Sequence, residues 1–373
     1  MAGDLTSAKR LVIKIGSAIL VESESGRLRE NWLTSLCNDI ATLKTQGKDI
    51  IIVSSGAIAL GRARLGLIDQ SLSLNEKQAC AAAGQSLLTR AYERGLEAHD
   101  IVTAQALLTL NDTESRRRWL NARSTLETVI KLGAVPIINE NDTVATDEIR
   151  YGDNDRLAAR TAQMLGADTL ILLSDIDGLY TADPRNDKSA KHLPSIEELT
   201  DEIMAIGGGI NAQAAVGSGG MATKLAAAKV AVQAGCAMCI MDGRENKPLT
   251  RLANGERCSW FSAQNNPKKA RRQWIGGTLK PSGSLIVDTG AAKALTQGNS
   301  LLAAGVTKLE GDFRKGDAVA VLTLEGEELA RGLVSYDASD AVKILGLKSK
   351  DILAVLGYDN GAALIHRDNL VML

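Results

Sequence analysis

Short apolar runs alternate with longer amphipathic stretches through the first 240 residues. Each run is followed by Gly, Ser, Asn or Asp, which is typical of a buried strand; the runs are Leu11–Ile15, Asp49–Val53, Ala134–Ile138, Thr169–Leu173 and Cys236–Met241. Stretches with helical spacing lie between several of them, at Trp32–Gln46, Glu76–His99, Arg116–Leu132 and Asp155–Leu165. This alternation predicts an α/β fold with a mostly parallel sheet, in which ligands bind beyond the carboxyl ends of the strands.

The pattern changes after about residue 250. Residues 254–280 show no clear apolar period and contain a basic run at 267–272. Short strands broken by glycine follow, and we predict them at Ser284–Asp288, Asp317–Leu324, Leu329–Ser335 and Asp351–Leu356. Such strands are typical of a small β-barrel. We therefore predict a first domain at 1–260, a linker at 261–280 and a second domain at 281–373.

Composition excludes several classes of protein. With 45% apolar and 23% charged residues, the chain can bury a large core, and a net charge of −1 gives no general attraction to nucleic acid or membranes. The N-terminus lacks a signal-peptide pattern, and no stretch approaches the roughly 20 apolar residues of a membrane span. Five cysteines, an odd number, argue against a disulfide framework. We therefore expect a soluble cytoplasmic protein.

Cys236 and Cys239 share a predicted strand, and their spacing raises the possibility of a redox or zinc site. Residues three apart on a strand point to opposite faces, and the chain has no second cysteine pair at zinc spacing. We interpret both as buried structural thiols.

Polar residues that follow the strands are the candidates for chemistry. Lys14 lies within an apolar strand, so either its ammonium group reaches water at a sheet edge or it pairs with an anion. Residues 139–155 are rich in acids and asparagines, and form either a solvated turn or a loop that binds ammonium or Mg²⁺. Three glycines at 217–220 precede an Ala-rich helix whose N–H groups are suited to phosphate, with Lys224 beside them.

Taken together, these motifs resemble the glutamate 5-kinase family of the amino acid kinase superfamily. The motifs are Lys14-Ile15-Gly16-Ser17, Ser54-Ser55-Gly56-Ala57, Asn139-Glu140-Asn141-Asp142, Gly152-Asp153-Asn154-Asp155, Ser174-Asp175, Ala182-Asp183-Pro184-Arg185 and Ser218-Gly219-Gly220-Met221-Ala222-Thr223-Lys224. The tail resembles a PUA domain through Asp288-Thr289-Gly290-Ala291, Gly305-Val306 and Gly311-Asp312-Phe313. The order and spacing of the motifs carry the resemblance, which covers nearly the whole chain.

The resemblance implies an αβα sandwich of the carbamate-kinase type and ATP-dependent phosphorylation of the side-chain carboxylate of L-glutamate, the first step of proline biosynthesis. It implies roles for particular residues. The catalytic residues would be Lys14 and Lys224, which would bind the phosphates and the transferring group, and Asp155, which would hold the two lysines. The glutamate-binding residues would be Ser54, Asp142 and Asn154. The nucleotide-binding residues would be Ser174, Asp175, Ser218, Gly219, Gly220, Met221, Ala222 and Thr223. Mg²⁺ would bridge the phosphates, with no protein ligand assigned to it.

The resemblance also implies feedback inhibition by proline, and we expect a homo-oligomer. Proline shares the α-carboxylate and cationic nitrogen of glutamate, so a loop at 139–155 that binds those groups would accept either molecule.

Two alternatives stay open. One is another amino acid kinase, acting on N-acetylglutamate, aspartate or carbamate; the Asn-Glu-Asn-Asp motif and the tail argue against it. The other is an RNA-binding protein, since PUA domains elsewhere bind RNA. Residues 281–360 contain eight basic and eleven acidic residues, a net charge of −3 that is poorly suited to phosphates. We therefore do not expect nucleic acid as a partner.

Overall fold

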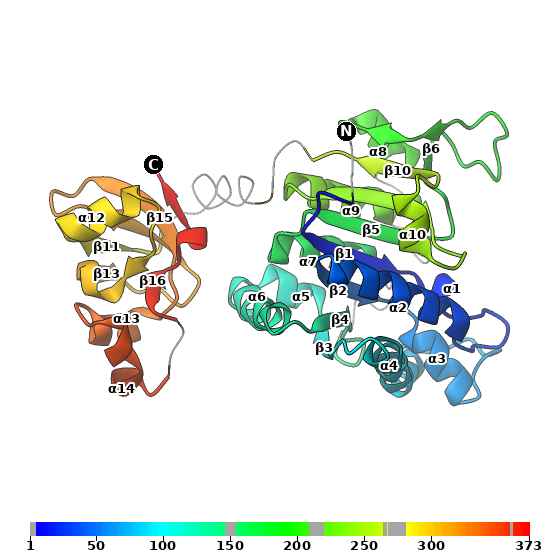
Figure 1. Cartoon of the computed structure of the whole chain (residues 1–373), viewed down its shortest axis with the longest axis horizontal. Helices are drawn as coiled ribbons and strands as arrows, with labels where there is room; N and C mark the ends of the chain where they lie inside the picture. The colour runs from blue at the N-terminus through cyan, green and yellow to red at the C-terminus, as the bar shows by residue number, and fades with distance from the viewer. Residues whose placement is uncertain (1–4, 146–153, 209–219, 264–266, 268–280, 359–360) are drawn as a thin grey trace. The chain divides into compact units, whose positions relative to one another are not determined.

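The computed structural model describes residues 5–145, 154–208, 220–263, 267, 281–358 and 361–373 (Figure 1). The chain divides into two compact units, residues 1–267 and 268–373. The division falls within the predicted linker 261–280. The first unit contains two hydrophobic core clusters, and the second unit contains one.

The first unit is built on an eight-stranded sheet with the order β3-β4-β2-β1-β5-β9-β10-β8. Its strands are β1 Arg10–Ile15, β2 Asp49–Ser54, β3 Thr103–Leu108, β4 Val135–Glu140, β5 Thr169–Ser174, β8 Ser195–Ile196, β9 Ala237–Asp242 and β10 Cys258–Phe261. Six neighbouring strands of this sheet, β3, β4, β2, β1, β5 and β9, run parallel to one another, while β10 runs antiparallel to β9. A separate two-stranded sheet joins β6 Leu179–Tyr180 to β7 His192–Leu193. The carboxyl ends of the six parallel strands therefore lie along one edge, with β1 near the middle.

Helices cover both faces of this sheet (Figure 1). They are α1 Ser17–Leu20, α2 Glu30–Thr45, α3 Ala57–Arg64, α4 Leu74–Glu97, α5 Leu110–Glu114, α6 Arg116–Lys131, α7 Asn154–Leu165, α8 Asp201–Ile206, α9 Met221–Gln233 and α10 Pro248–Ala253. One core joins α2, α3, α4 and α10 to the sheet, and the other joins α6, α7 and α9. In β1, Ile13 belongs to the first core and Val12 to the second, because successive side chains on a strand point to opposite faces. The predicted αβα sandwich is confirmed.

Two glycines allow helices α3 and α4 to pack with their backbones in close contact. A Cβ atom on Gly61 would lie 1.8 Å from the carbonyl oxygen of Cys80, and one on Gly84 would lie 1.8 Å from that of Ala57. Only glycine permits backbones to approach so closely. The start of α4 is set by a capping box, in which Ser73 and Glu76 bond each other's backbone N–H groups. Residues of α4 near Gly84 therefore hold a fixed position relative to the loop that follows β2.

The second unit contains a five-stranded sheet with the order β13-β11-β14-β15-β17 and a two-stranded pair, β12-β16. The strands are β11 Gly283–Val287, β12 Leu301–Leu302, β13 Val306–Gly311, β14 Ala318–Leu322, β15 Glu328–Leu333, β16 Ala363–Ile365 and β17 Leu370–Met372. The helical segments are α12 Thr289–Thr296, η3 Ala303–Gly305, α13 Ala338–Ile344, η4 Ser349–Asp351, α14 Ile352–Leu356 and η5 Arg367–Asn369. A core that includes the buried rings of Phe313 and Tyr336 joins them.

Several strands were not predicted from the sequence, among them β10, β13 and β17, and two differences have a clear physical reason. The predicted strand at 351–356 is wrong: the segment is a 3₁₀ turn followed by α14. Ile352 and Leu356 pack on the core while Leu353 and Val355 are exposed, which is the spacing of a helix. Strand β3 was not predicted, because at the edge of the sheet it is half exposed and lacks a continuous apolar run.

The five cysteines of the chain all lie in the first unit. All five are free thiols, and Cys236 and Cys239 are fully buried. Among the described residues, no helix is both long and apolar enough to cross a membrane.

We predict that a chain ending at residue 280 folds without the second unit, because the core clusters of the first unit share no residue with the core of the second. Far-UV circular dichroism during urea denaturation is expected to show one cooperative transition for this truncated chain. Unfolding without a cooperative transition would place the domain boundary elsewhere.

Candidate active site

A buried carboxylate flanked by two lysines lies at the carboxyl edge of the sheet. The Nζ of Lys14 lies 2.6 Å from Oδ1 of Asp155, and the Nζ of Lys224 lies 3.2 Å from its Oδ2. The side chains of Lys14, Asp155 and Lys224 are 11%, 2% and 7% exposed. The cluster carries a net positive charge in a region that water scarcely reaches, so it favours an anion nearby.

Three separate elements supply these side chains. Lys14 shares the face of β1 with Val12, against which α7 and α9 pack, so it does not reach water at a sheet edge. Asp155 lies in the first turn of α7, where the helix dipole favours a negative charge. Lys224 lies in the first turn of α9. Burial alone raises the pKa of the Asp155 carboxyl, but the ammonium groups of Lys14 and Lys224 outweigh it and hold that pKa below its usual range.

Asn154 binds two elements at once. Its Nδ2 donates to the hydroxyl of Ser55 at 2.8 Å and to Oδ1 of Asn139 at 2.9 Å. Its own Oδ1 is buried and has no hydrogen-bond partner among the described residues. Buried acceptors in proteins are nearly always bonded, so this oxygen is suited to a donor from a ligand.

Ser54, which was predicted to bind glutamate, lies away from this group. It is fully buried, and its hydroxyl lies 2.8 Å from the hydroxyl of Tyr92 on α4. Ser55 contacts Asn154 instead. Alternation explains the difference: Ser54 shares a face with Ile52, whereas Ser55 continues the face of Val53, which is the α7 face. Applied to β2, the same alternation would have found Ser55 from the sequence.

Asp142 follows β4 and is 9% exposed. Burial raises the pKa of its carboxyl from the usual 3.8 to about 6. It forms no hydrogen bond or ion pair with any residue that the structure describes, so none of these residues compensates for its loss of water. A carboxylate in this setting is suited to a cationic ligand such as an ammonium group.

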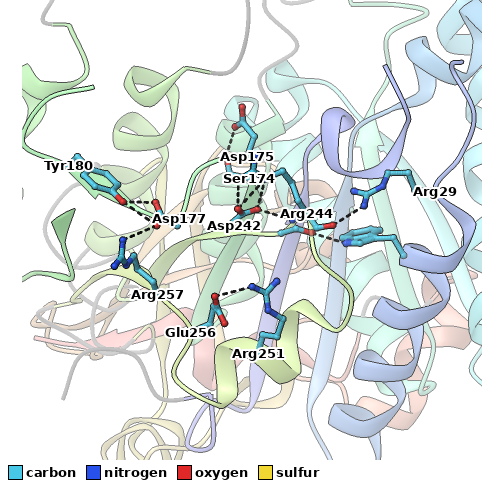
Figure 2. A network of polar contacts seen from close by, with 12 residues as sticks. Arg29, Ser174, Asp175, Asp177, Tyr180, Asp242, Arg244, Arg251, Glu256 and Arg257 are labelled. Atoms are coloured by element: carbon cyan, nitrogen blue, oxygen red, sulfur yellow. Dashed lines mark hydrogen bonds and ion pairs between the residues drawn. The ribbon is translucent and has the colours of Figure 1, made fainter. Parts of the chain in front are cut away.

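The predicted nucleotide-binding residues Ser174 and Asp175 lie at the carboxyl end of β5, where Ser174 is the last residue of the strand. Figure 2 shows them beside Asp242, the last residue of the adjacent strand β9, and Arg244 in the turn after it. The Ser174 hydroxyl donates to Asp175 at 3.2 Å, and the carboxylate of Asp242 accepts from the backbone N–H and the guanidinium of Arg244. Trp32 anchors this turn by donating to the carbonyl of Gly243 at 2.7 Å. This end of the sheet therefore presents an exposed carboxylate beside a fixed arginine.

A second polar group in Figure 2 lies on the turn before β6. The hydroxyl of Tyr180 donates to Asp177 at 2.9 Å, and Arg257 lies 3.5 Å from the same carboxylate. These contacts join the turn to the segment before β10.

Part of the predicted glycine loop can be located. Gly220 is the N-cap of α9 and offers no side chain to cap it, and Met221, Ala222 and Thr223 form the first turn with Lys224. The Thr223 hydroxyl donates to the carbonyl of Gly220 at 2.8 Å. The same hydroxyl lies 3.3 Å from Oδ2 of Asp155, and this contact holds the start of α9 beside that carboxylate. Ser218 and Gly219 lie outside the described residues, as do Gly152 and Asp153.

Among the described residues, no group of three or more histidines, cysteines, aspartates or glutamates could hold a metal ion. Both oxygens of Asp155 face lysine ammonium groups.

Comparison with known proteins decides the family. Residues 9–242 match the amino acid kinase family, and residues 283–356 match the PUA domain. The chain is 55% identical over 368 residues to the glutamate 5-kinase of Paramagnetospirillum magneticum, covering 99% of each chain. The chain belongs to the amino acid kinase family and, within it, to the glutamate 5-kinases.

A second glutamate 5-kinase, from Caulobacter vibrioides, is 56% identical over 370 residues, which cover 99% of this chain and 98% of that one. The resemblance drawn from the motifs, including the PUA domain, is therefore confirmed. The structure of UMP kinase from Ureaplasma parvum covers 68% of this chain and 98% of its own, at 16% identity and a TM-score of 0.48.

The raised pKa of Asp142 leads to a prediction about stability. An acid whose pKa is higher in the folded state destabilises that state once it ionises, so the penalty is absent below about pH 4 and complete above about pH 6. We expect Asp142→Asn to raise the free energy of unfolding by about 3 kcal/mol at pH 8, at roughly 1.4 kcal/mol per pKa unit. Urea denaturation at pH 8 and at pH 4 measures the difference.

The matched control is Asp69→Asn, at an exposed aspartate. It is expected to change stability little at either pH. Equal stability of Asp142→Asn and the unaltered protein at pH 8 would show that the Asp142 carboxylate is compensated in the folded state.

Proposed function

We propose that this enzyme transfers the γ-phosphoryl group of ATP to the side-chain carboxylate of L-glutamate, and that the transfer occurs at the Lys14–Asp155–Lys224 cluster. The observation that carries the proposal is the order β4-β2-β1-β5-β9 of the parallel strands. Ser55 and Asp142 follow β2 and β4 on one side of Lys14, where Asn154 bonds Ser55, while Ser174 and Asp175 lie at the end of β5 on the other side. The high identity to glutamate 5-kinases over the whole chain supports the choice of substrate.

The chemistry requires charge compensation rather than a base. A glutamate side chain has an unperturbed pKa of about 4.3 and is ionised at neutral pH, so it is ready to attack phosphorus. The difficulty is repulsion between this carboxylate and the phosphates of ATP. Catalysis then depends on positioning and on cations that stabilise the transferring group.

The two lysines have complementary positions for this task. Lys14, on the central strand, lies between the proposed glutamate and nucleotide sides, where its ammonium group can contact the transferring phosphoryl group. Lys224 stands at the start of α9, where backbone N–H groups also favour phosphate. Asp155 holds both ammonium groups in place before the substrates bind.

The glutamate side combines an acceptor with an acid. The unpartnered Oδ1 of Asn154 and the carboxylate of Asp142 both suit the α-ammonium group of an amino acid. Ser55, rather than Ser54, supplies the hydroxyl on this side. N-acetylation would remove the ammonium charge, and aspartate would leave the reacting carboxylate one methylene short.

We propose that Mg²⁺ enters with ATP, held by the phosphates rather than by a protein cluster. Mg²⁺ gives up its water reluctantly and prefers water and phosphate oxygens as ligands, so it is commonly bound through the phosphates of a substrate. Bound in this way, the ion neutralises phosphate charge.

We predict that L-glutamate is the preferred acceptor. Protein, ATP, Mg²⁺ and hydroxylamine are incubated with L-glutamate, aspartate or N-acetylglutamate, and the acyl phosphate is trapped as a hydroxamate. The signal is expected to be strong with L-glutamate and much weaker with the others. A preference for aspartate or N-acetylglutamate would overturn the assignment.

Lys224→Ala is expected to lower kcat at least about 100-fold, the effect of losing one contact that stabilises transition-state charge. The control is Lys229→Ala, which removes an exposed lysine from the same helix and leaves kcat near that of the unaltered enzyme. A kcat within threefold of the unaltered enzyme for Lys224→Ala would remove Lys224 from the catalytic centre.

Inhibition by proline belongs to the same proposal. Because proline shares the α-carboxylate and cationic nitrogen of glutamate, we expect it to overlap the glutamate position near Asp142 and Asn154. Proline should then raise the apparent KM for glutamate without lowering kcat, as initial rates over a grid of both concentrations would show. Inhibition that saturating glutamate cannot relieve would exclude overlap. Asp147 and Glu148, further candidates for this contact, lie outside the described residues.

The cytoplasmic location and the homo-oligomeric state are also part of the proposal. They rest on the sequence, and size-exclusion chromatography with light scattering measures the second.

A further inference from the structure

Asn154 belongs to a longer series of side-chain amides that starts on α4. Its Nδ2 donates to Oδ1 of Asn139, whose Nδ2 donates in turn to Oε1 of Gln85 at 2.8 Å. The Nε2 of Gln85 lies 3.3 Å from the hydroxyl of Thr89, one helical turn further along α4. The series thus links the end of β4, the start of α7 and the middle of α4.

Backbone groups decide which end of each amide is the oxygen. The N–H of Glu140, which can only donate, bonds Oδ1 of Asn139 at 2.9 Å. The Thr89 hydroxyl donates its hydrogen to the backbone carbonyl of Gln85 at 3.0 Å. Its oxygen therefore acts as the acceptor for the Nε2 of the Gln85 side chain. Every amide in the series therefore has one permitted orientation, and the unpartnered atom at its end is the Oδ1 of Asn154.

We propose that Gln85 is a positioning residue for the glutamate site: through Asn139 it orients the amide of Asn154 so that the carbonyl oxygen, not the NH₂ group, is presented to the substrate. The inference rests on the proposed function. Gln85 has no contact with Lys14, Asp155 or Lys224 among the described residues, and it acts only through Asn139.

The alternative orientation shows what Gln85 prevents. Without its Oε1, the Nδ2 of Asn139 loses its acceptor, and the Asn139 amide keeps only the bond from the Glu140 N–H as an anchor against rotation. A rotated Asn139 would direct its NH₂ group at the NH₂ group of Asn154, which would then turn as well. The site would present a donor to the α-ammonium group of glutamate, and both would be donors.

The position of Gln85 is well fixed. It follows Gly84, which packs against the carbonyl of Ala57 at the start of α3. Ala57 lies two residues after Ser55, which accepts from the other hydrogen of Asn154. The close contact between α3 and α4 therefore fixes the position of Gln85 relative to Ser55, the other residue that constrains the Asn154 amide.

The test compares Gln85→Met with Gln85→Glu in the full-length enzyme. Methionine has similar length but lacks both polar atoms, whereas glutamate keeps the oxygen that accepts from Asn139. Hydroxamate formation is measured with L-glutamate and with glutarate, which lacks the ammonium group. Ser86→Ala, at the adjacent exposed position, is the matched control.

For Gln85→Met we expect KM for L-glutamate to rise about threefold to tenfold, the scale of one lost neutral hydrogen bond. The KM for ATP and the kcat/KM for glutarate should stay unchanged, because neither involves the α-ammonium group. Gln85→Glu and Ser86→Ala should keep the KM for L-glutamate within twofold of the unaltered enzyme. A general structural defect would instead affect glutamate, glutarate and ATP together.

A Gln85→Met enzyme with unaltered KM for L-glutamate, or with equal losses for L-glutamate and glutarate, would overturn the proposal. So would a Gln85→Glu variant as impaired as Gln85→Met. Should Gln85→Met not fold, Thr89→Val removes the acceptor of the Gln85 NH₂ group, and a smaller rise in the same KM is expected; an unchanged KM there would count against the proposal. An unaltered enzyme inactive on L-glutamate would instead refute the proposed function.

Discussion

The structure depends on the burial of one carboxylate, Asp155, between two ammonium groups. Removing such charges from water costs several kcal/mol per ion, and only close pairing offsets that loss. Lys14 comes from β1, Asp155 from α7 and Lys224 from α9, so the pairing holds only when these three elements dock together. The same requirement leaves a net positive charge at the carboxyl edge of the sheet, where a phosphate can bind.

Around this charged centre the protein buries polar groups in two other ways. The side-chain amides of Gln85, Asn139 and Asn154 form a neutral hydrogen-bonded series with a single orientation. The Oδ1 of Asn154, at the end of the series, has no partner among the described residues. Asp142 is the opposite case, because its carboxyl is buried without a described partner and its pKa is raised to about 6. Both features are unfavourable, and an ammonium group is the kind of partner that would compensate both.

Residues near the site illustrate how far the sequence could be interpreted. The strands β1, β2, β4, β5 and β9 were predictable because each is a continuous apolar run buried on both faces. Strand β3 is half exposed at the sheet edge, and α14 contains an apolar run whose burial follows helical spacing, so composition alone misled in both places. The motif alone did not show which of Ser54 and Ser55 contacts Asn154, although the alternation of side chains along β2 directs the two to opposite faces of the sheet.

The sequence by itself determined the family, the sandwich fold and the residue types at the edge of the sheet, because these follow from apolar periodicity and from motifs in order along the chain. Only the tertiary structure decided which of these residues meet. Lys14 and Lys224 are 210 positions apart, and Gln85 and Asn139 are 54 apart. Their contacts depend on strand order, on which face of a strand a side chain occupies and on the close approach of α3 and α4. Such contacts arise from packing between distant segments, and no local pattern records them.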